Sequence, residues 1–137
     1  MRYYCSWIEE DTIYIVMEYC ESSVKDVYLQ TKKDGKFIPE DKLKEILRQA
    51  LIGLKCMHEH NMVHLDIKPD NLLMKDGEVK VADLGLCRIT RIKRWTDLDE
   101  GDSRYLAKEV LNYNLGIDLK KSDIYSLGMS IFQGALL

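Results

Sequence analysis

One short run of residues, followed at a fixed distance by a second motif, constrains this chain more than any other feature. The run reads His64-Leu65-Asp66-Ile67-Lys68-Pro69-Asp70-Asn71, and the second motif is Asp83-Leu84-Gly85. Together they place two carboxylates, an amide and a lysine near the ends of predicted strands. Magnesium prefers oxygen ligands, and phosphoryl transfer depends on a carboxylate beside the attacking hydroxyl. Asp66 suits the second task, and Asn71 and Asp83 suit the holding of a metal.

A polar turn between a helix and a strand is the simplest alternative for this run. It accounts for Pro69 and Asp70, but not for a second Asp-x-Gly at this distance. Protein kinases carry His-Arg-Asp-Leu-x-x-x-Asn followed by Asp-Phe-Gly. The chain has Leu65 where that pattern has Arg, and Leu84 where it has Phe. The order and spacing of the motifs, together with Lys68, make the chain resemble a protein kinase.

The resemblance implies roles for the residues of both motifs. Asp66 would be the base that orients the acceptor hydroxyl of a protein substrate. Lys68 would neutralise the phosphate that is transferred from ATP. Asn71 and Asp83 would be ligands of Mg2+.

The resemblance also implies a hinge between two lobes, at Glu18-Tyr19-Cys20. In a kinase, main-chain groups of the hinge hydrogen-bond the adenine of ATP, and Met17 would guard the back of that pocket. Met17, Glu18 and Cys20 are therefore the predicted nucleotide-binding residues. An ordinary strand end is the alternative, and without the downstream motifs it would be preferred.

Residue patterns predict an α+β fold that is mainly helical. The clearest helix spans Pro39 to His60, because apolar residues recur every three or four positions from Leu43 to Met57. It would present the loop that starts at Met62. The other predicted elements are a β-hairpin with one face suited to burial (Arg2–Ile8 and Thr12–Tyr19), a short helix (Ser23–Lys32), two short strands (Leu72–Met74 and Glu78–Ala82), a charged loop (Leu86–Leu106), and a buried apolar helix capped by Ser122 and ending at Leu137.

The composition limits the class of protein further. A chain of 137 residues makes one domain at most, and 46% apolar residues are enough for a core. A formal net charge of −3 argues against a nucleic-acid surface. The four cysteines include no Cys-x-x-Cys pair, which is typical of reduced thiols inside cells. The sequence shows neither a signal peptide nor an apolar run of the ~20 residues that a membrane span needs.

A second resemblance narrows the kinase family to its Wee branch. It rests on the run Glu100-Gly101-Asp102-Ser103-Arg104-Tyr105-Leu106-Ala107, and on the departures at positions 65 and 84. Wee kinases phosphorylate an inhibitory tyrosine of cyclin-dependent kinases and so delay mitosis. The resemblance therefore implies a cyclin-dependent kinase as partner and an intracellular location, with the nucleus favoured over the cytoplasm. It also implies that Asp123 braces the catalytic loop. Myt kinases, which share Gly-Asp-x-Arg-Tyr, and a generic Ser/Thr kinase remain alternatives.

Several parts of a complete kinase domain are missing from the sequence. It contains no Gly-rich loop, no Val-Ala-Ile-Lys lysine and no glutamate-bearing helix. We expect residues 1–137 to be a partial kinase domain, with the last small-lobe hairpin and the hinge in residues 1–20 and a large-lobe fragment in residues 21–137. The 137-residue chain alone is expected to be inactive. A non-catalytic kinase-like module that binds a partner through its docking segment is the alternative function.

Overall fold

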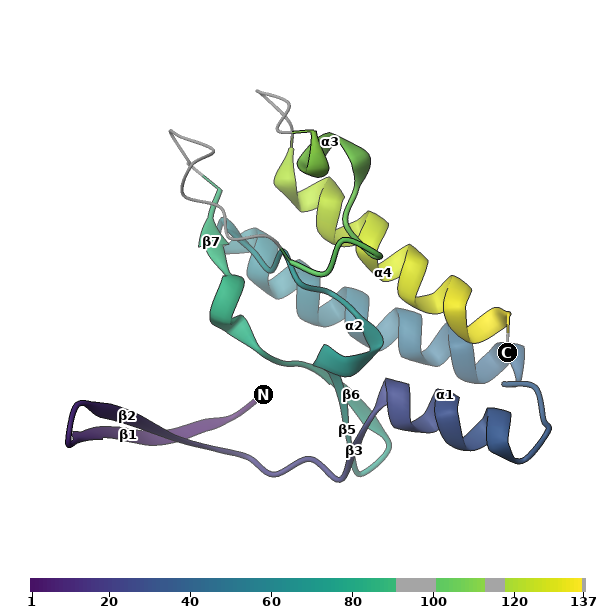
Figure 1. Cartoon of the computed structure of the whole chain (residues 1–137), viewed down its shortest axis with the longest axis horizontal. Coiled ribbons are helices and arrows are strands. Elements are labelled where there is room, and N and C mark those ends of the chain that lie inside the picture. The colour runs from purple at the N-terminus through teal and green to yellow at the C-terminus, as the bar shows by residue number, and fades with distance from the viewer. Residues whose placement is uncertain (91–100, 113–117, 137) are drawn as a thin grey trace.

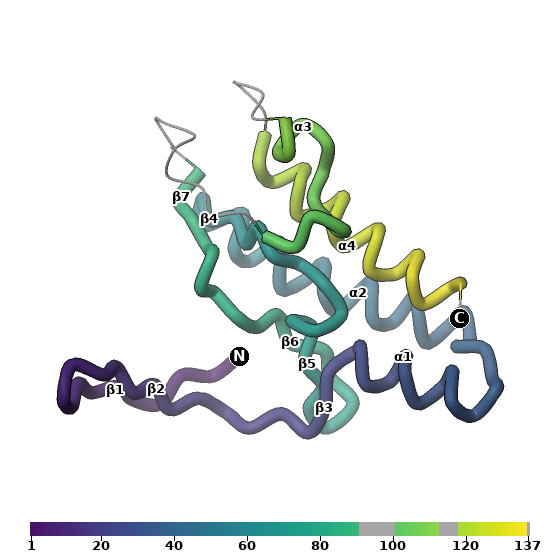
Figure 2. The backbone as a smooth tube through the Cα atoms, viewed as in Figure 1, coloured from purple at the N-terminus to yellow at the C-terminus, as the bar shows by residue number. Residues whose placement is uncertain are grey.

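The structure is a computed structural model that describes residues 1–90, 101–112 and 118–136. A long hairpin extends to one side of the molecule, and the long helices gather on the other side (Figure 1). The trace of the backbone shows α2 and α4 running beside each other, and the two helices are in contact (Figure 2). The described elements are β1 (Tyr3–Glu9), β2 (Thr12–Met17), β3 (Ser22–Ser23), α1 (Val24–Lys33), α2 (Glu40–Glu59), β4 (Met62–Val63), the 3-10 helix η1 (Pro69–Asn71), β5 (Leu72–Lys75), β6 (Glu78–Val81), the 3-10 helix η2 (Leu84–Leu86), β7 (Arg88–Ile89), α3 (Lys108–Leu111) and α4 (Leu119–Ala135). The predicted α+β architecture is confirmed.

Strands β1 and β2 form the predicted antiparallel hairpin. Its turn places Glu10 and Asp11 at positive φ, the backbone form that two-residue hairpin turns require. Trp7 and Tyr14 face each other across the strands and stack, with ring centroids 5.1 Å apart. The prediction that one face is buried is wrong, because every residue of both strands is exposed, Ile13 to 66%. Alternation shows only that a strand has an apolar face, not that another element covers it.

Helices α1 and α2 follow the sequence prediction closely. Ser23 caps α1 in a capping box, in which its hydroxyl accepts the Asp26 N–H and the Asp26 carboxylate accepts the Ser23 N–H. In α2 the residues at the predicted spacing form the buried stripe Leu43, Ile46, Ala50 and Leu54. These side chains join the main apolar core, where burying a Leu or Ile contributes ~1.5–3 kcal/mol.

Two small sheets hold the loops between the helices. Strands β5 and β6 pair antiparallel around Asp76 and Gly77, as predicted, and β3 adds to the free edge of β5. Strand β4 pairs with β7, which lies inside the segment that the sequence indicated as a loop. Two residues are too few to produce a recognisable alternation, so this strand had no signal. Residues 91–100 of that predicted loop lie outside the described residues.

The last helix begins earlier than predicted. Asp118, not Ser122, is the N-cap of α4, and its carboxylate accepts the Lys120 N–H. Ser122 lies inside the helix and is buried. Asp and Ser are equally good caps, so the sequence offered two starting points and the downstream one was chosen. One side of the helix faces outward, since Ile124, Tyr125 and Phe132 are exposed.

Two glycines of α4 give a matched test of how α1 packs on it. A Cβ atom at Gly134 would lie 2.5 Å from Cζ of Tyr28, whereas one at Gly128 would meet nothing within 4 Å. The Tyr28 hydroxyl also donates to the Ser130 carbonyl at 3.2 Å. The tyrosine ring of α1 therefore fits a notch that only glycine leaves open.

We predict that Gly134→Ala destabilises the natural full-length protein, because overpacking costs ~1–3 kcal/mol and exceeds the gain of at most ~1 kcal/mol in helix propensity. Gly128→Ala is the control and should be neutral or stabilising. Chemical denaturation measures both. A Gly134→Ala protein as stable as the Gly128→Ala protein would contradict the packing described for Tyr28.

Candidate active site

The catalytic-loop run lies between β4 and η1, and α4 braces its backbone. The Asp123 carboxylate accepts the His64 N–H through Oδ2 and the Leu65 N–H through Oδ1, both at 2.9 Å. Nε2 of His58, on α2, lies 2.8 Å from Oδ2 of the same carboxylate. The brace that the resemblance implied for Asp123 is confirmed, and it fastens the loop to both long helices.

The loop is also held from the side of β6. Nε2 of the buried His64 ring lies 2.9 Å from the Ala82 carbonyl oxygen. Leu65 has φ 65°, in the left-handed region that bulky residues rarely enter. Its side chain is buried in an apolar cluster with Val63 and Leu119. This packing accounts physically for a leucine where most kinases carry a charged arginine.

Asp66 lies at the centre of a cluster that contains three of the predicted site residues. Its Oδ2 accepts from Lys68 Nζ and from Asn71 Nδ2, both at 2.8 Å, and Oδ1 accepts the Asp102 N–H at 3.2 Å. Asn71 Nδ2 also donates to the Asp66 carbonyl at 2.8 Å. The Asp66 residue is only 8% exposed. The carboxylate is thus fixed in orientation and faces one predicted metal ligand and one cation.

The charges around Lys68 keep it protonated. Burial would lower the pKa of its amine, but the hydrogen bond and charge of Asp66, with further charge from Asp102 and Asp70, raise the pKa above its usual value. A charged amine beside Asp66 suits the neutralisation of a phosphate.

Asp83 is not part of the Asp66 cluster. It lies on a segment whose backbone is hydrogen-bonded to that of Asn71. It follows β6 at φ 61°, it is exposed, and its Oδ1 accepts the Gly85 N–H. The Ala82 N–H donates to the Asn71 carbonyl at 2.9 Å, which holds the two predicted ligands on neighbouring segments. The Asn71 amide nitrogen is committed to Asp66, so its side-chain oxygen is the donor left for a cation. One amide oxygen and one carboxylate fit magnesium, which keeps several waters and binds phosphates. No group of three His, Cys, Asp or Glu in the described ranges suits a metal.

The predicted nucleotide-binding residues lie where the hairpin joins the rest of the chain. Met17 ends β2 and is exposed, Cys20 is a half-buried free thiol, and the Glu18 N–H donates to the Arg2 carbonyl. Met17 and Asp83 line the same cavity of about 1000 Å³, together with Val81 and Leu84, whereas Glu18 and Cys20 do not line it. A nucleotide that uses both sets of residues would therefore enter along the edge of this cavity.

A contact that the sequence did not reveal joins Gly101 and Asp102 to the catalytic loop. A Cβ atom at Gly101 would lie 2.3 Å from the Leu65 carbonyl oxygen, so only glycine allows this approach. The next residue, Asp102, donates its N–H to Asp66 and pairs with Arg104, whose Nε lies 2.9 Å from Oδ1. The hydrogen bond from Arg104 lowers the pKa of Asp102 to about 2. The sequence signal for this contact was the Gly101-Asp102 pair. Its partner Asp66 is 36 positions away in the sequence, so a local pattern could not reveal the contact.

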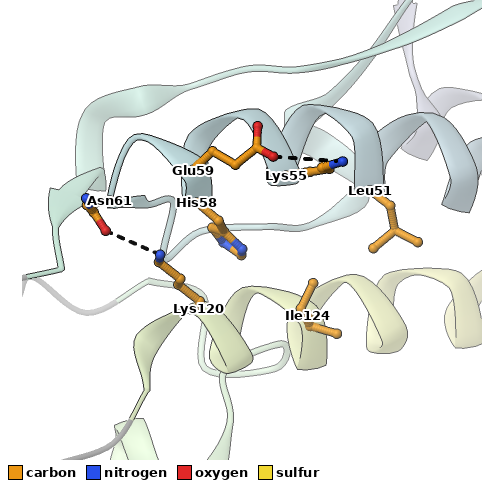
Figure 3. Close-up of a pocket in the computed structure, with 7 residues that line it drawn as sticks. All are labelled: Leu51, Lys55, His58, Glu59, Asn61, Lys120 and Ile124. Carbon is orange, nitrogen blue, oxygen red and sulfur yellow. Dashed lines mark hydrogen bonds and ion pairs between the residues drawn. The ribbon is translucent and has the colours of Figure 1, made fainter.

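A second cavity, of about 580 Å³, lies between α2 and α4 and includes none of the predicted site residues. Figure 3 shows its lining, with the His58 ring pointing from α2 toward α4. Lys55 pairs with Glu59, and Lys120 donates to the Asn61 side chain. His58 connects this cavity to the Asp123 brace.

The family model of the protein kinase domain matches residues 1–136. The chain therefore belongs to the protein kinase family. The relatives that it resembles include proteins named Wee1-like protein kinases. It is 40% identical to Wee1-like protein kinase 2 of Xenopus tropicalis over 152 residues, 38% to that of Gallus gallus over 154 residues, and 36% to the Wee1-like protein kinase of Arabidopsis thaliana over 131 residues. Each alignment covers 96% of this chain and 25–26% of the relative. The chain thus spans about a quarter of the length of these relatives.

The resemblance to the Wee branch is confirmed by these comparisons. None of the helices in the described ranges is long and apolar enough to cross a membrane.

The fixed pair of Asp102 and Arg104 leads to a prediction about activation. In kinases that a loop phosphate switches on, new Arg–phosphate pairs order the loop, and Leu65 cannot form such a pair. We predict that the natural full-length protein with Thr90→Ala and Thr96→Ala keeps near wild-type kcat, whereas Arg104→Ala lowers kcat. Thr96 lies outside the described residues. Steady-state kinetics on unphosphorylated protein measures this. A protein that stays inactive until Thr90 or Thr96 is phosphorylated would refute it.

Proposed function

We propose that the natural protein containing this chain is a Wee-type kinase that transfers the γ-phosphoryl group of ATP to a protein hydroxyl. The observation that carries the proposal is the Asp66 carboxylate, which three donors hold in one orientation beside the Lys68 amine. Phosphoryl transfer is catalysed mainly by positioning and charge stabilisation, and the cluster is suited to both.

In this proposal Asp66 accepts a hydrogen bond from the acceptor hydroxyl and takes its proton. The hydroxyl oxygen forms a bond to the γ-phosphorus of ATP as the bond to the leaving ADP oxygen breaks. Lys68 neutralises the transferring phosphate. Mg2+, held by Asn71 and Asp83, would supply charge neutralisation on the nucleotide phosphates. Main-chain groups of Glu18 and Cys20 would hold adenine beside Met17.

The finer parts of the proposal concern the acceptor and the setting. We infer that the acceptor is a tyrosine of a cyclin-dependent kinase, that its phosphorylation delays mitosis, and that the protein acts in the nucleus. The supporting observation is the similarity to kinases named Wee1-like, which extends over 96% of the chain. Lys68 does not exclude tyrosine as the acceptor.

The direct test is Asp66→Asn in the natural full-length protein, assayed with a tyrosine-containing peptide and its serine counterpart. A general base contributes ~10²–10⁴-fold, so kcat should fall by at least ~100-fold. Asp76→Asn is the matched control: it makes the same change at a turn residue with positive φ, where asparagine is tolerated, and should leave kcat unchanged. Near-normal kcat for Asp66→Asn would make the base assignment wrong. Phosphate on the serine peptide alone would contradict the tyrosine acceptor.

Asp83→Asn tests the metal site separately. We predict that it weakens magnesium-dependent ATP binding, because the carboxylate is the only charged member of the proposed ligand pair. Calorimetric titration of ATP with and without Mg2+ measures the effect. Wild-type protein that binds no ATP under either condition would favour a non-catalytic kinase-like module.

A further inference from the structure

The side chain of Glu18 makes contacts of its own, in addition to the hydrogen bond of its backbone N–H. This side chain is 7% exposed and bridges three segments of the chain. The carboxylate accepts the Arg2 N–H at the start of the hairpin, and its Oε2 lies 3.5 Å from Lys80 Nζ on β6 and 3.8 Å from Lys75 Nζ on β5. A carboxylate at the predicted hinge thus faces cations of the β5–β6 hairpin.

The surroundings of this carboxylate favour its charged form. Burial alone would raise the pKa of Glu18, but the Arg2 hydrogen bond and the charges of Lys80 and Lys75 hold the pKa below its usual value. The Lys80 side chain is 23% exposed, so water screens this ion pair less than it screens a fully exposed pair. The other carboxylate near Lys80 belongs to Glu78, at 3.5 Å and 70% exposed. Both carboxylates lie 3.5 Å from the lysine, and of the two Glu18 is the one that joins Lys80 to a segment outside the β5–β6 hairpin.

The position of Lys80 explains how the ion pair with Glu18 bears on nucleotide binding. Lys80 lies in β6, and the chain leaves this strand directly into Asp83, the proposed magnesium ligand. Glu18 lies in the segment whose main chain would hold adenine. The ion pair therefore links the two ends of the nucleotide site across segments that are 62 positions apart in the sequence.

We propose that the Glu18 carboxylate and Lys80 form a positioning pair that holds the hinge at a set distance from β6, so that adenine and the metal-bound phosphates of one nucleotide reach their partners together. This inference rests on the proposed function, because it requires ATP to be the ligand. Lys80 lines the same cavity as Met17 and Asp83, whereas Glu18 does not. The role that we assign to the pair is positioning, through the backbone segments that the two side chains join.

The test uses Glu18→Gln and Lys80→Met in the natural full-length protein. Couplings between contacting segments are typically ~0.5–2 kcal/mol, so the KM for ATP should rise about two- to thirtyfold while kcat stays near wild type. Amide hydrogen exchange at Glu21, whose N–H donates to the Met74 carbonyl of β5 at 3.0 Å, should become faster. Glu78→Gln is the matched control, since it removes a carboxylate from the same lysine without touching the hinge, and it should change neither quantity.

The exchanged pair, Glu18→Lys with Lys80→Glu, should recover part of the lost affinity, which a purely local disturbance would not allow. An unchanged KM in Glu18→Gln, an equal effect of Glu78→Gln, or a rise in kcat would each overturn the inference. Those results leave ATP binding by the wild-type protein intact. Wild-type protein that fails to bind ATP would overturn the proposed function instead, so the two failures are distinguishable.

Discussion

The Asp123 carboxylate is the interaction on which the rest of the site depends. It is 1% exposed and accepts hydrogen bonds from two consecutive backbone N–H groups, while His58 contacts it from the neighbouring helix. Burying a charge is costly unless hydrogen bonds replace its water. Here the carboxylate supplies acceptors that His64 and Leu65 would otherwise lack inside the protein. The charge and the loop backbone therefore stabilise each other.

The consequences of this brace can be followed along the loop. It holds Leu65 in the left-handed conformation, which turns the chain so that Asp66 faces Lys68 and Asn71. Asn71 then pairs through its carbonyl with Ala82, beside Asp83, and His64 contacts the Ala82 carbonyl. Gly101 and Asp102 close the cluster from the activation segment. The catalytic loop is thus held by contacts from residues 82, 101–102 and 123, which lie in three separate parts of the sequence.

The sequence predicted those parts of the structure that depend on local patterns. The stripe of α2, the cap of α1 and the Asp-Gly turn between β5 and β6 each follow from residues within a few positions of one another. The motif spacing also predicted that Asp66, Lys68 and Asn71 lie together. The start of α4 was missed because Asp118 and Ser122 are equivalent capping residues, and β7 because two residues carry no period. Three features depend on segments that are distant in the sequence, for which a local pattern gives no signal. They are the exposure of the hairpin, the contact of Asp102 with Asp66 and the ion pair of Glu18 with Lys80.

Amide hydrogen exchange at His64 and Leu65 tests the central claim most directly, because these are the two N–H groups that Asp123 holds. In Asp123→Asn the amide presents a donor where one N–H needs an acceptor, and a loss of ~1.4 kcal/mol corresponds to tenfold faster exchange. Asp118→Asn is the control in the same helix, since asparagine caps as well as aspartate. We predict exchange at least about tenfold faster at one of the two residues in Asp123→Asn, with wild-type rates in Asp118→Asn. Equal protection of His64 and Leu65 in Asp123→Asn and in the wild-type protein would show that another contact holds the loop, and would contradict this account.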